Sequence, residues 1–166
     1  MKKLFVVRHG YQEKHALTDH GIRQMKWVIE EIRRRFSGAK IVVVAADTSH
    51  VKESAAMITG ELGLEEAVIT DLLCPESLDR AEAEQLIREL RRVGESTDVL
   101  LVVARTGLHM VIGHWLDTTN NAFDAETKED RKRSRSDRNI FDTYGCGYVL
   151  DYERGTCEAV HNEVKW

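Results

Sequence analysis

The sequence contains little cysteine and no long apolar run, and both absences narrow the classes of protein to which it can belong. Its three cysteines (Cys74, Cys146 and Cys157) are an odd number at spacings that match no zinc or redox motif, so we expect no metal site built on them. No apolar stretch approaches the roughly 20 residues that span a bilayer, and the N-terminus has no secretory signal pattern. We therefore predict a cytoplasmic protein that does not enter the membrane.

The chain also lacks a large excess of charge of either sign. Its 166 residues carry a formal net charge of −4, which gives no overall attraction to nucleic acid or to anionic lipid. Any anion must therefore bind at a local group of cations. Because 42% of the residues are hydrophobic and no repeat or linker interrupts the chain, we predict that residues 1–166 form a single domain with a substantial core.

Short apolar runs alternate with segments of helical periodicity along most of the chain. This alternation predicts an α/β protein in which helices cover both faces of a mostly parallel sheet. Thr18 is placed to cap the first helix, and the run 99–103 is continuously apolar, as is typical of a central strand. The last two strands are predicted to form a hairpin at one end of the sheet. The predicted extended segments are Leu4–Val7, Ile41–Val44, Ala67–Thr70, Val99–Val103, Phe141–Asp151 and Thr156–Val160, and the predicted helices are Thr18–Phe36, Ser49–Leu62, Asp79–Val93 and Gly107–Leu116.

The tripeptide Arg8-His9-Gly10 follows directly on the first of these apolar runs. Open α/β sheets bind ligands at the carboxyl ends of their strands, and a cation beside an imidazole at that edge favours a phosphate site. A neutral imidazole can attack phosphorus, and the guanidinium of Arg8 presents a planar fork to phosphate oxygens. Gly10 allows the backbone to turn sharply away from a ligand. The competing interpretation is that Arg8 and His9 only solvate the end of a strand.

Two motifs resemble those with which members of the histidine phosphatase superfamily, the phosphoglycerate-mutase-like group, begin. They are Leu4-Phe5-Val6-Val7-Arg8-His9-Gly10 and Leu17-Thr18-Asp19-His20-Gly21-Ile22-Arg23-Gln24. Because the chain is short and lacks the large inserted helical subdomain of the mutases, it is most similar to the small phosphohistidine phosphatases of the SixA type. The resemblance covers nearly the whole chain. It implies a three-layer α/β/α sandwich, a phosphohistidine intermediate on His9 and no cofactor.

The sequence departs from this family at two positions of the expected pocket. Where relatives have a second arginine after the second strand this chain has His50, and where they have a second histidine after a later strand it has Arg105. If the two exchanges compensate each other, the pocket still holds two arginines and two histidines and still binds phosphate. If they reflect decay, the oxygen-binding geometry is lost and turnover is slow or absent.

Three further features carry weaker predictions. Glu76, beside the only proline, is the local candidate for the acid that protonates a leaving group, and a solvated loop carboxylate is the competing interpretation. His15 is expected near the mouth of the pocket, and no histidine pair has the spacing of a metal site. The charged run 126–138 is predicted to be a solvated loop, because acids interrupt it and no aromatic residues interleave with it. The competing interpretations are a contact for an acidic or phosphorylated partner and, as the weaker alternative, a contact for the phosphates of nucleic acid.

The sequence thus predicts a phosphatase that transfers a phosphoryl group to His9 and then to water. The expected partner is a phosphohistidine protein or a small phosphoester, with Arg8, His50 and Arg105 holding the phosphate. The alternative is a catalytically impaired relative that binds phosphorylated ligands or a partner protein without turnover. Whether His50 and Arg105 face His9 across one pocket decides whether the two exchanges can compensate each other.

Overall fold

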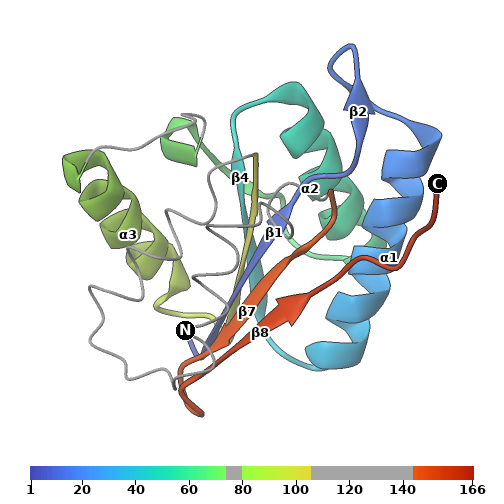
Figure 1. Ribbon diagram of the computed structural model, residues 1–166. Coiled ribbons are helices and arrows are strands. Elements are labelled where there is room, and N and C mark those ends of the chain that lie inside the picture. Colours follow the sequence, from blue (N-terminus) through green and yellow to red (C-terminus); the bar gives the residue numbers. More distant parts are fainter. Residues whose placement is uncertain (74–79, 106–143) are drawn as a thin grey trace.

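The computed structural model describes residues 1–73, 80–105 and 144–166, and its centre is a single six-stranded sheet (Figure 1). The strands of this sheet are β1 (Lys3–Arg8), β4 (Ile41–Ala46), β5 (Val68–Thr70), β6 (Val99–Ala104), β7 (Gly147–Asp151) and β8 (Thr156–Val160). Their order across the sheet is β5-β4-β6-β1-β7-β8. The first four of these pair in parallel, whereas β7 runs antiparallel to both β1 and β8. The predicted, mostly parallel sheet is therefore confirmed.

Helices cover both faces of the sheet, which gives the predicted three layers. They are α1 (Asp19–Arg35), α2 (Ser49–Leu62) and α3 (Arg80–Gly94). Helices α1 and α2 lie side by side on one face, and α3 lies on the other (Figure 1). Thr18 caps α1 as predicted, because its hydroxyl oxygen accepts the backbone N–H of Gly21 at 3.1 Å. Gly63 ends α2 in the left-handed conformation that favours glycine.

The hydrophobic core lies on both sides of the central strands. Every residue of β6 is buried, and Leu4, Phe5, Val6 and Val7 of β1 are fully buried. Strands covered by helices on both faces need apolar side chains at successive positions, and this explains why their sequences do not alternate. As predicted, β6 is a central strand, with β4 on one side and β1 on the other. The core therefore holds the carboxyl ends of these strands in a fixed register.

The structure extends or shortens some predicted elements. Strand β4 continues two residues beyond the predicted end at Val44, because Ala45 still pairs with β6 and with β5. The strand predicted from residue 141 begins at Gly147 in the described part of the chain. The residues just before it form a turn, in which Gly145 has a φ of 69°. The C-terminal hairpin of β7 and β8 lies at one edge of the sheet, as predicted.

A short hairpin that the sequence did not predict connects β1 to α1. It consists of β2 (Gln12–Glu13) and β3 (Ala16–Leu17), which form a separate two-stranded sheet. The two residues between them, Lys14 and His15, both have positive φ. Turns of this kind are usually marked by asparagine, aspartate or glycine, and this loop contains none of them. The hairpin therefore had no recognisable signal in the sequence.

Several predictions concern residues outside the described ranges. They are the helix at 107–116, the charged run 126–138, Glu76 and Cys74. Strand β5 is followed directly by a short 3-10 helix, η1 (Asp71–Leu73). Within residues 1–73, 80–105 and 144–166, no helix combines the length and the apolar character that a membrane crossing requires.

Candidate active site

Four predicted site residues lie at the carboxyl ends of three neighbouring strands. Arg8 is the last residue of β1 and His9 follows it, His50 lies in the first turn of α2 just after β4, and Arg105 follows β6. Because β4, β6 and β1 are adjacent and parallel, these ends meet at one edge of the sheet. Residues separated by almost 100 positions in the sequence are thus brought to one place.

The rings of His9 and His50 pack directly against each other in this cluster. Their centroids are 4.3 Å apart and their planes are tilted by 60°. Both side chains are buried, at 3% exposure for His9 and 4% for His50. Neither ring nitrogen of His50 has a hydrogen-bond partner among the described residues. Buried polar atoms are normally hydrogen-bonded, and both ring nitrogens of His50 therefore keep the capacity to bind a polar group.

The structure determines which nitrogen of His9 can act as a nucleophile. Nδ1 lies 2.7 Å from the carbonyl oxygen of Gly10, and because a carbonyl only accepts, Nδ1 carries the proton. The lone pair is therefore on Nε2. Burial lowers the pKa of His9 to about 3. The hydrogen bond to Gly10 raises this pKa, whereas the electrostatic influence of His50, Arg8 and Arg105 lowers it further. His9 is consequently a neutral imidazole at pH 7.

The two exchanged positions, His50 and Arg105, both influence the protonation of the paired histidine rings. Burial lowers the pKa of His50, and the charges of Arg105, His15 and Arg8 lower it further. His50 is therefore neutral at pH 7 and does not replace the charge of an arginine. Arg105 supplies that charge instead, since its guanidinium influences the pKa of both His9 and His50. The two exchanged positions thus lie with Arg8 and His9 at the carboxyl edge of the sheet, and the compensating exchange itself stays a prediction.

Comparison with known proteins connects this arrangement to a fold. No protein-family model matches the chain, and no curated protein matches its sequence significantly. Solved structures do resemble it over almost its full length. The alpha-ribazole phosphatase from Shigella flexneri has a TM-score of 0.60 at 16% identity, covering 97% of this chain and 96% of its own. The chain has the histidine phosphatase fold.

Two further solved structures of this fold are similar to the same extent. The protein histidine phosphatase SixA in complex with tungstate has a TM-score of 0.62 at 16% identity, with 96% of this chain and 94% of that chain covered. The phosphoserine phosphatase of Entamoeba histolytica, with 3-phosphoglyceric acid, has a TM-score of 0.61 at 15% identity, with 97% and 96% covered. These likenesses confirm the predicted histidine phosphatase fold.

The second sequence motif holds the loop that carries His9. A Cβ atom on Gly21 would lie 2.0 Å from the carbonyl oxygen of Tyr11, and one on Gly10 would lie 2.5 Å from the carbonyl oxygen of Gly21. Only glycine allows the two backbones to approach this closely. Thr18 donates its hydroxyl to the Tyr11 carbonyl at 3.3 Å, and Gln24 accepts the Tyr11 N–H at 2.8 Å. Thr18, Gly21 and Gln24 therefore fix the backbone next to His9, which explains their spacing in this histidine phosphatase fold.

Ser54 connects the two histidines through the backbone and was not predicted from the sequence. Its hydroxyl accepts the N–H of Gly10 at 3.3 Å and donates to the carbonyl of His50 at 3.0 Å. The side chain is fully buried. Ser54 thus joins the loop after β1 to the first turn of α2. The only signal for it was its place four residues after His50, which brings it onto the same face of the helix.

Tyr144 is a second residue of the site that the sequence did not indicate. Its ring lies under the guanidinium of Arg8, whose Cζ atom is 3.9 Å from the ring centroid. The same ring meets His9 edge-on, with the centroids 5.3 Å apart. The only signal in the sequence was the pair of glycines that follow it at positions 145 and 147.

The remaining predicted residues lie at or beyond the border of this cluster. His15 is in the turn between β2 and β3, and its carbonyl accepts a hydrogen bond from Ser49 at the start of α2. Glu76 is outside the described ranges. Across the described part of the chain, no group of three or more histidine, cysteine, aspartate or glutamate side chains is arranged to hold a metal ion.

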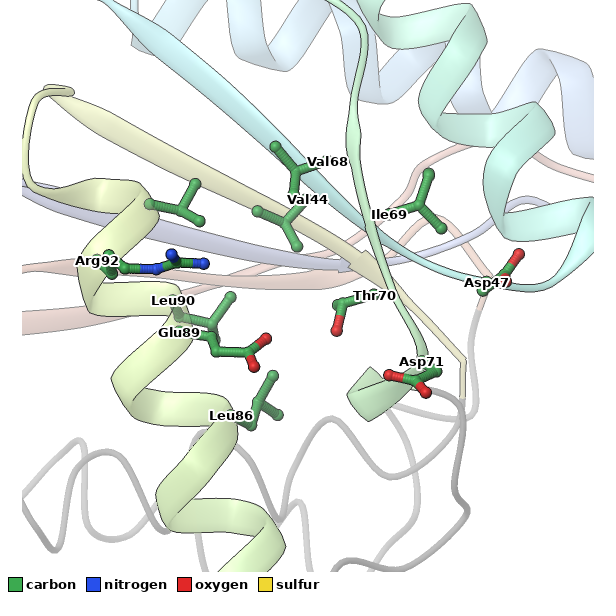
Figure 2. Close-up of a pocket in the computed structure, with 11 residues that line it drawn as sticks. Val44, Asp47, Val68, Ile69, Thr70, Asp71, Leu86, Glu89, Leu90 and Arg92 are labelled. Carbon is green, nitrogen blue, oxygen red and sulfur yellow. The ribbon is translucent and has the colours of Figure 1, made fainter.

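A separate groove of about 430 Å³ lies between β5 and α3 (Figure 2). Apolar side chains such as Val44 and Leu90 line it together with Asp71, Glu89 and Arg92. None of the four clustered residues at the carboxyl edge contributes to this groove. It is therefore distinct from the candidate active site, and no sequence motif pointed to it.

Proposed function

We propose that the protein is a phosphatase that transfers a phosphoryl group to Nε2 of His9 and then to water. The observation that carries this proposal is the neutral imidazole of His9, whose Nδ1 proton is bound to Gly10 so that Nε2 keeps its lone pair. Further support comes from solved structures of the same fold, which bear the names of phosphohistidine, phosphoserine and alpha-ribazole phosphatases.

In the first step, Nε2 of His9 forms a bond to phosphorus while the bond from phosphorus to the leaving atom breaks. The leaving group departs with the electron pair of that bond. The guanidinium groups of Arg8 and Arg105 balance the negative charge on the phosphoryl oxygens, and positioned charge of this kind supplies most of the catalysis in phosphoryl transfer. His50, which is neutral, donates a ring N–H to one of the same oxygens.

In the second step, a water molecule attacks phosphorus and the bond from phosphorus to Nε2 breaks. Nε2 recovers its electron pair, inorganic phosphate leaves, and the proton of the water passes to solvent. His9 is then neutral again, in the protonation state that its low pKa favours. The cycle needs no group beyond the chain and water.

The substrate that this set of residues suits best is phosphohistidine. A protonated imidazole leaves without an acid from the protein, whereas the oxygen of a phosphoester needs a proton as it departs. His9 with its two arginines therefore suffices for a phosphohistidine protein. A small phosphoester would in addition require an acid, the role predicted for Glu76.

The experiment that tests the proposal is a trapping measurement with a histidine peptide phosphorylated with labelled phosphate. Wild-type protein quenched after brief mixing should carry acid-labile label, and peptide mapping should place this label at His9. The variant His9→Ala should carry none and should lose phosphatase activity by a factor of about 10³ or more. His161→Ala, which changes an exposed histidine, serves as the matched control and should behave like wild type.

Absence of both label and hydrolysis in the wild-type protein, under conditions where tungstate still binds, would contradict the proposal. That result would favour the alternative in which the chain binds phosphorylated ligands without turnover.

A further inference from the structure

The ring of Tyr144 touches both principal residues of the proposed site. The Arg8 guanidinium lies over its face at 3.9 Å, and the ring of His9 meets it edge-on at 5.3 Å. A guanidinium at this distance from an aromatic face is attracted by the negative potential of the ring. The ring also packs edge-on against Tyr11 at 5.2 Å, so it is held between the loop after β1 and the two site residues.

Backbone hydrogen bonds hold Tyr144 in this place independently of its ring. The N–H of Gly145 donates to the carbonyls of Arg8 and His9, at 3.1 and 3.2 Å. In return, the N–H of Arg8 donates to the carbonyl of Cys146 at 2.9 Å. The backbone segment that carries Tyr144 is therefore hydrogen-bonded directly to the segment that carries His9.

The two glycines after Tyr144 are required by this close approach. A Cβ atom on Gly147 would lie 2.0 Å from the carbonyl oxygen of Val6, and one on Gly145 would lie 2.5 Å from Nδ2 of Asn162. Gly145 also has a φ of 69°, which side chains rarely adopt. Asn162 donates the same Nδ2 to the Gly145 carbonyl at 3.3 Å. The position from which the Tyr144 side chain starts is thus determined by several contacts.

We propose that Tyr144 is a positioning residue, whose ring keeps the Arg8 guanidinium in the orientation that binds phosphate and excludes water from one side of His9. This inference rests on the proposed function, because it assigns Arg8 and His9 to a phosphoryl group. An arginine side chain without such a support samples many rotamers, and fixing it at the moment of binding costs free energy. A ring that fixes it in advance removes part of this cost, and the role requires the ring rather than the hydroxyl.

The test compares Tyr144→Ala and Tyr144→Phe with the matched control Tyr152→Ala. Tyr144 lies just before strand β7 and Tyr152 just after it, and both side chains are partly buried. Loss of phosphate affinity in Tyr152→Ala would therefore report a general loss of packing. The probe is inorganic phosphate, and its dissociation constant is measured by calorimetry. We expect Tyr144→Ala to raise this constant about tenfold, the size of a desolvated cation–π contact. Tyr144→Phe and Tyr152→Ala should stay within twofold of wild type.

A second readout follows the ring of His9 by NMR. The titratable and charged groups that influence the pKa of His9 are His50, Arg8 and Arg105, and all three are unchanged in these variants. Wild-type His9 should show no titration between pH 5 and pH 8, whereas Tyr144→Ala should bring its titration into this range because water reaches the ring. Tyr144→Leu, which keeps apolar volume at the site, should show the same loss of phosphate affinity if the alanine variant does not fold.

Wild-type phosphate affinity in both the alanine and the leucine variants would overturn the inference. So would a phenylalanine variant that binds as weakly as the alanine variant, since the hydroxyl would then be responsible. Neither measurement requires turnover. A wild-type protein that carries no label on His9 would therefore contradict the proposed function without affecting these results, and the two failures can be told apart.

Discussion

The two edges of the sheet hold positive charge in different ways. At the amino edge, lysines and arginines pair with carboxylates: Lys3 lies 3.3 Å from Asp151, and Arg35 makes two hydrogen bonds to Glu158, at 2.8 and 2.9 Å. At the carboxyl edge, the guanidinium of Arg8 lies against an aromatic ring and beside two buried imidazoles. Carboxylates pair with the cations of the first edge, whereas the Arg8 guanidinium stacks on the face of an aromatic ring, which attracts a cation through its negative potential.

The ionisable groups of the two edges affect the stability of the fold in opposite ways. The hydrogen bond from Arg35 is the main cause that lowers the pKa of Glu158, so the ionised pair favours the folded state at pH 7. Burial lowers the pKa of His9, so the folded state resists its protonation. The amino edge thus gains stability from its charges, while the carboxyl edge keeps a neutral imidazole at the expense of stability in acid.

The largest effect on stability and phosphate binding is expected from a substitution of Gly21, which packs against the loop at the carboxyl edge of the sheet. In Gly21→Ala, the new Cβ atom would lie 2.0 Å from the Tyr11 carbonyl oxygen, so the loop that carries His9 must move. We expect a loss of about 3 kcal/mol in the free energy of unfolding, measured in urea, together with loss of phosphate binding. Gly60→Ala in α2 is the control, because its Cβ atom would meet nothing within 4 Å. The control should be neutral or slightly stabilising. A Gly21→Ala protein as stable as this control would contradict the close approach.

A smaller effect is expected when pH is used to separate the two edges. An unfolded histidine titrates near pH 6.5, and folded His9 titrates at about 3, so below pH 6.5 the unfolded state binds more protons and stability falls as the pH is lowered. The loss attributable to His9 should be about 2 kcal/mol between pH 7 and pH 5. The loss of stability due to His9 should end near pH 3. The stability contributed by the ion pair of Arg35 and Glu158 should fall only below about pH 4.5, where Glu158 begins to take up a proton in the unfolded state.

Denaturant unfolding of His9→Ala at several pH values measures this contribution. The variant should lose less stability than wild type between pH 7 and pH 5, and the exposed-site variant His161→Ala should follow wild type. An identical pH dependence for His9→Ala and wild type would show that burial does not lower the pKa of His9.

The smallest effect is expected at the amino edge itself. Glu158→Gln removes the charge that pairs with Arg35, and because the Glu158 side chain is 60% exposed, the loss of stability should stay below about 1 kcal/mol. The difference from wild type should shrink in about 1 M salt, and phosphate affinity should not change. A change of more than twofold in phosphate affinity would show that the two edges are not independent.

Much of the fold could be predicted because its signals are local. The periodicity of apolar residues placed α1 with its Thr18 cap and gave the bounds of α2 without error. The continuous apolar run of β6 identified a central strand. The hairpin of β2 and β3 could not be predicted, because its turn adopts positive φ at Lys14 and His15 without the residues that usually allow it.

The residues of the candidate site divide in the same way, into those with a local signal in the sequence and those without one. Arg8 and His9 stand in a motif, and the family pattern pointed to His50 and Arg105. Ser54 was not predicted because its hydrogen bonds join two segments 44 residues apart. Tyr144 lies more than 130 positions beyond Arg8, and only the pairing of β7 with β1 brings their chains together.

The sequence by itself determined the alternation of the main strands and helices and the chemistry of the Arg8-His9 pair. These follow from side-chain periodicity and from short motifs, which act over a few residues. Only the tertiary structure decided that His9 is neutral with its lone pair on Nε2, that Arg105 and His50 lie close enough to influence its pKa, and that the Tyr144 ring lies against the Arg8 guanidinium. A pKa depends on burial and on neighbouring charges, and both arise only when distant segments pack together.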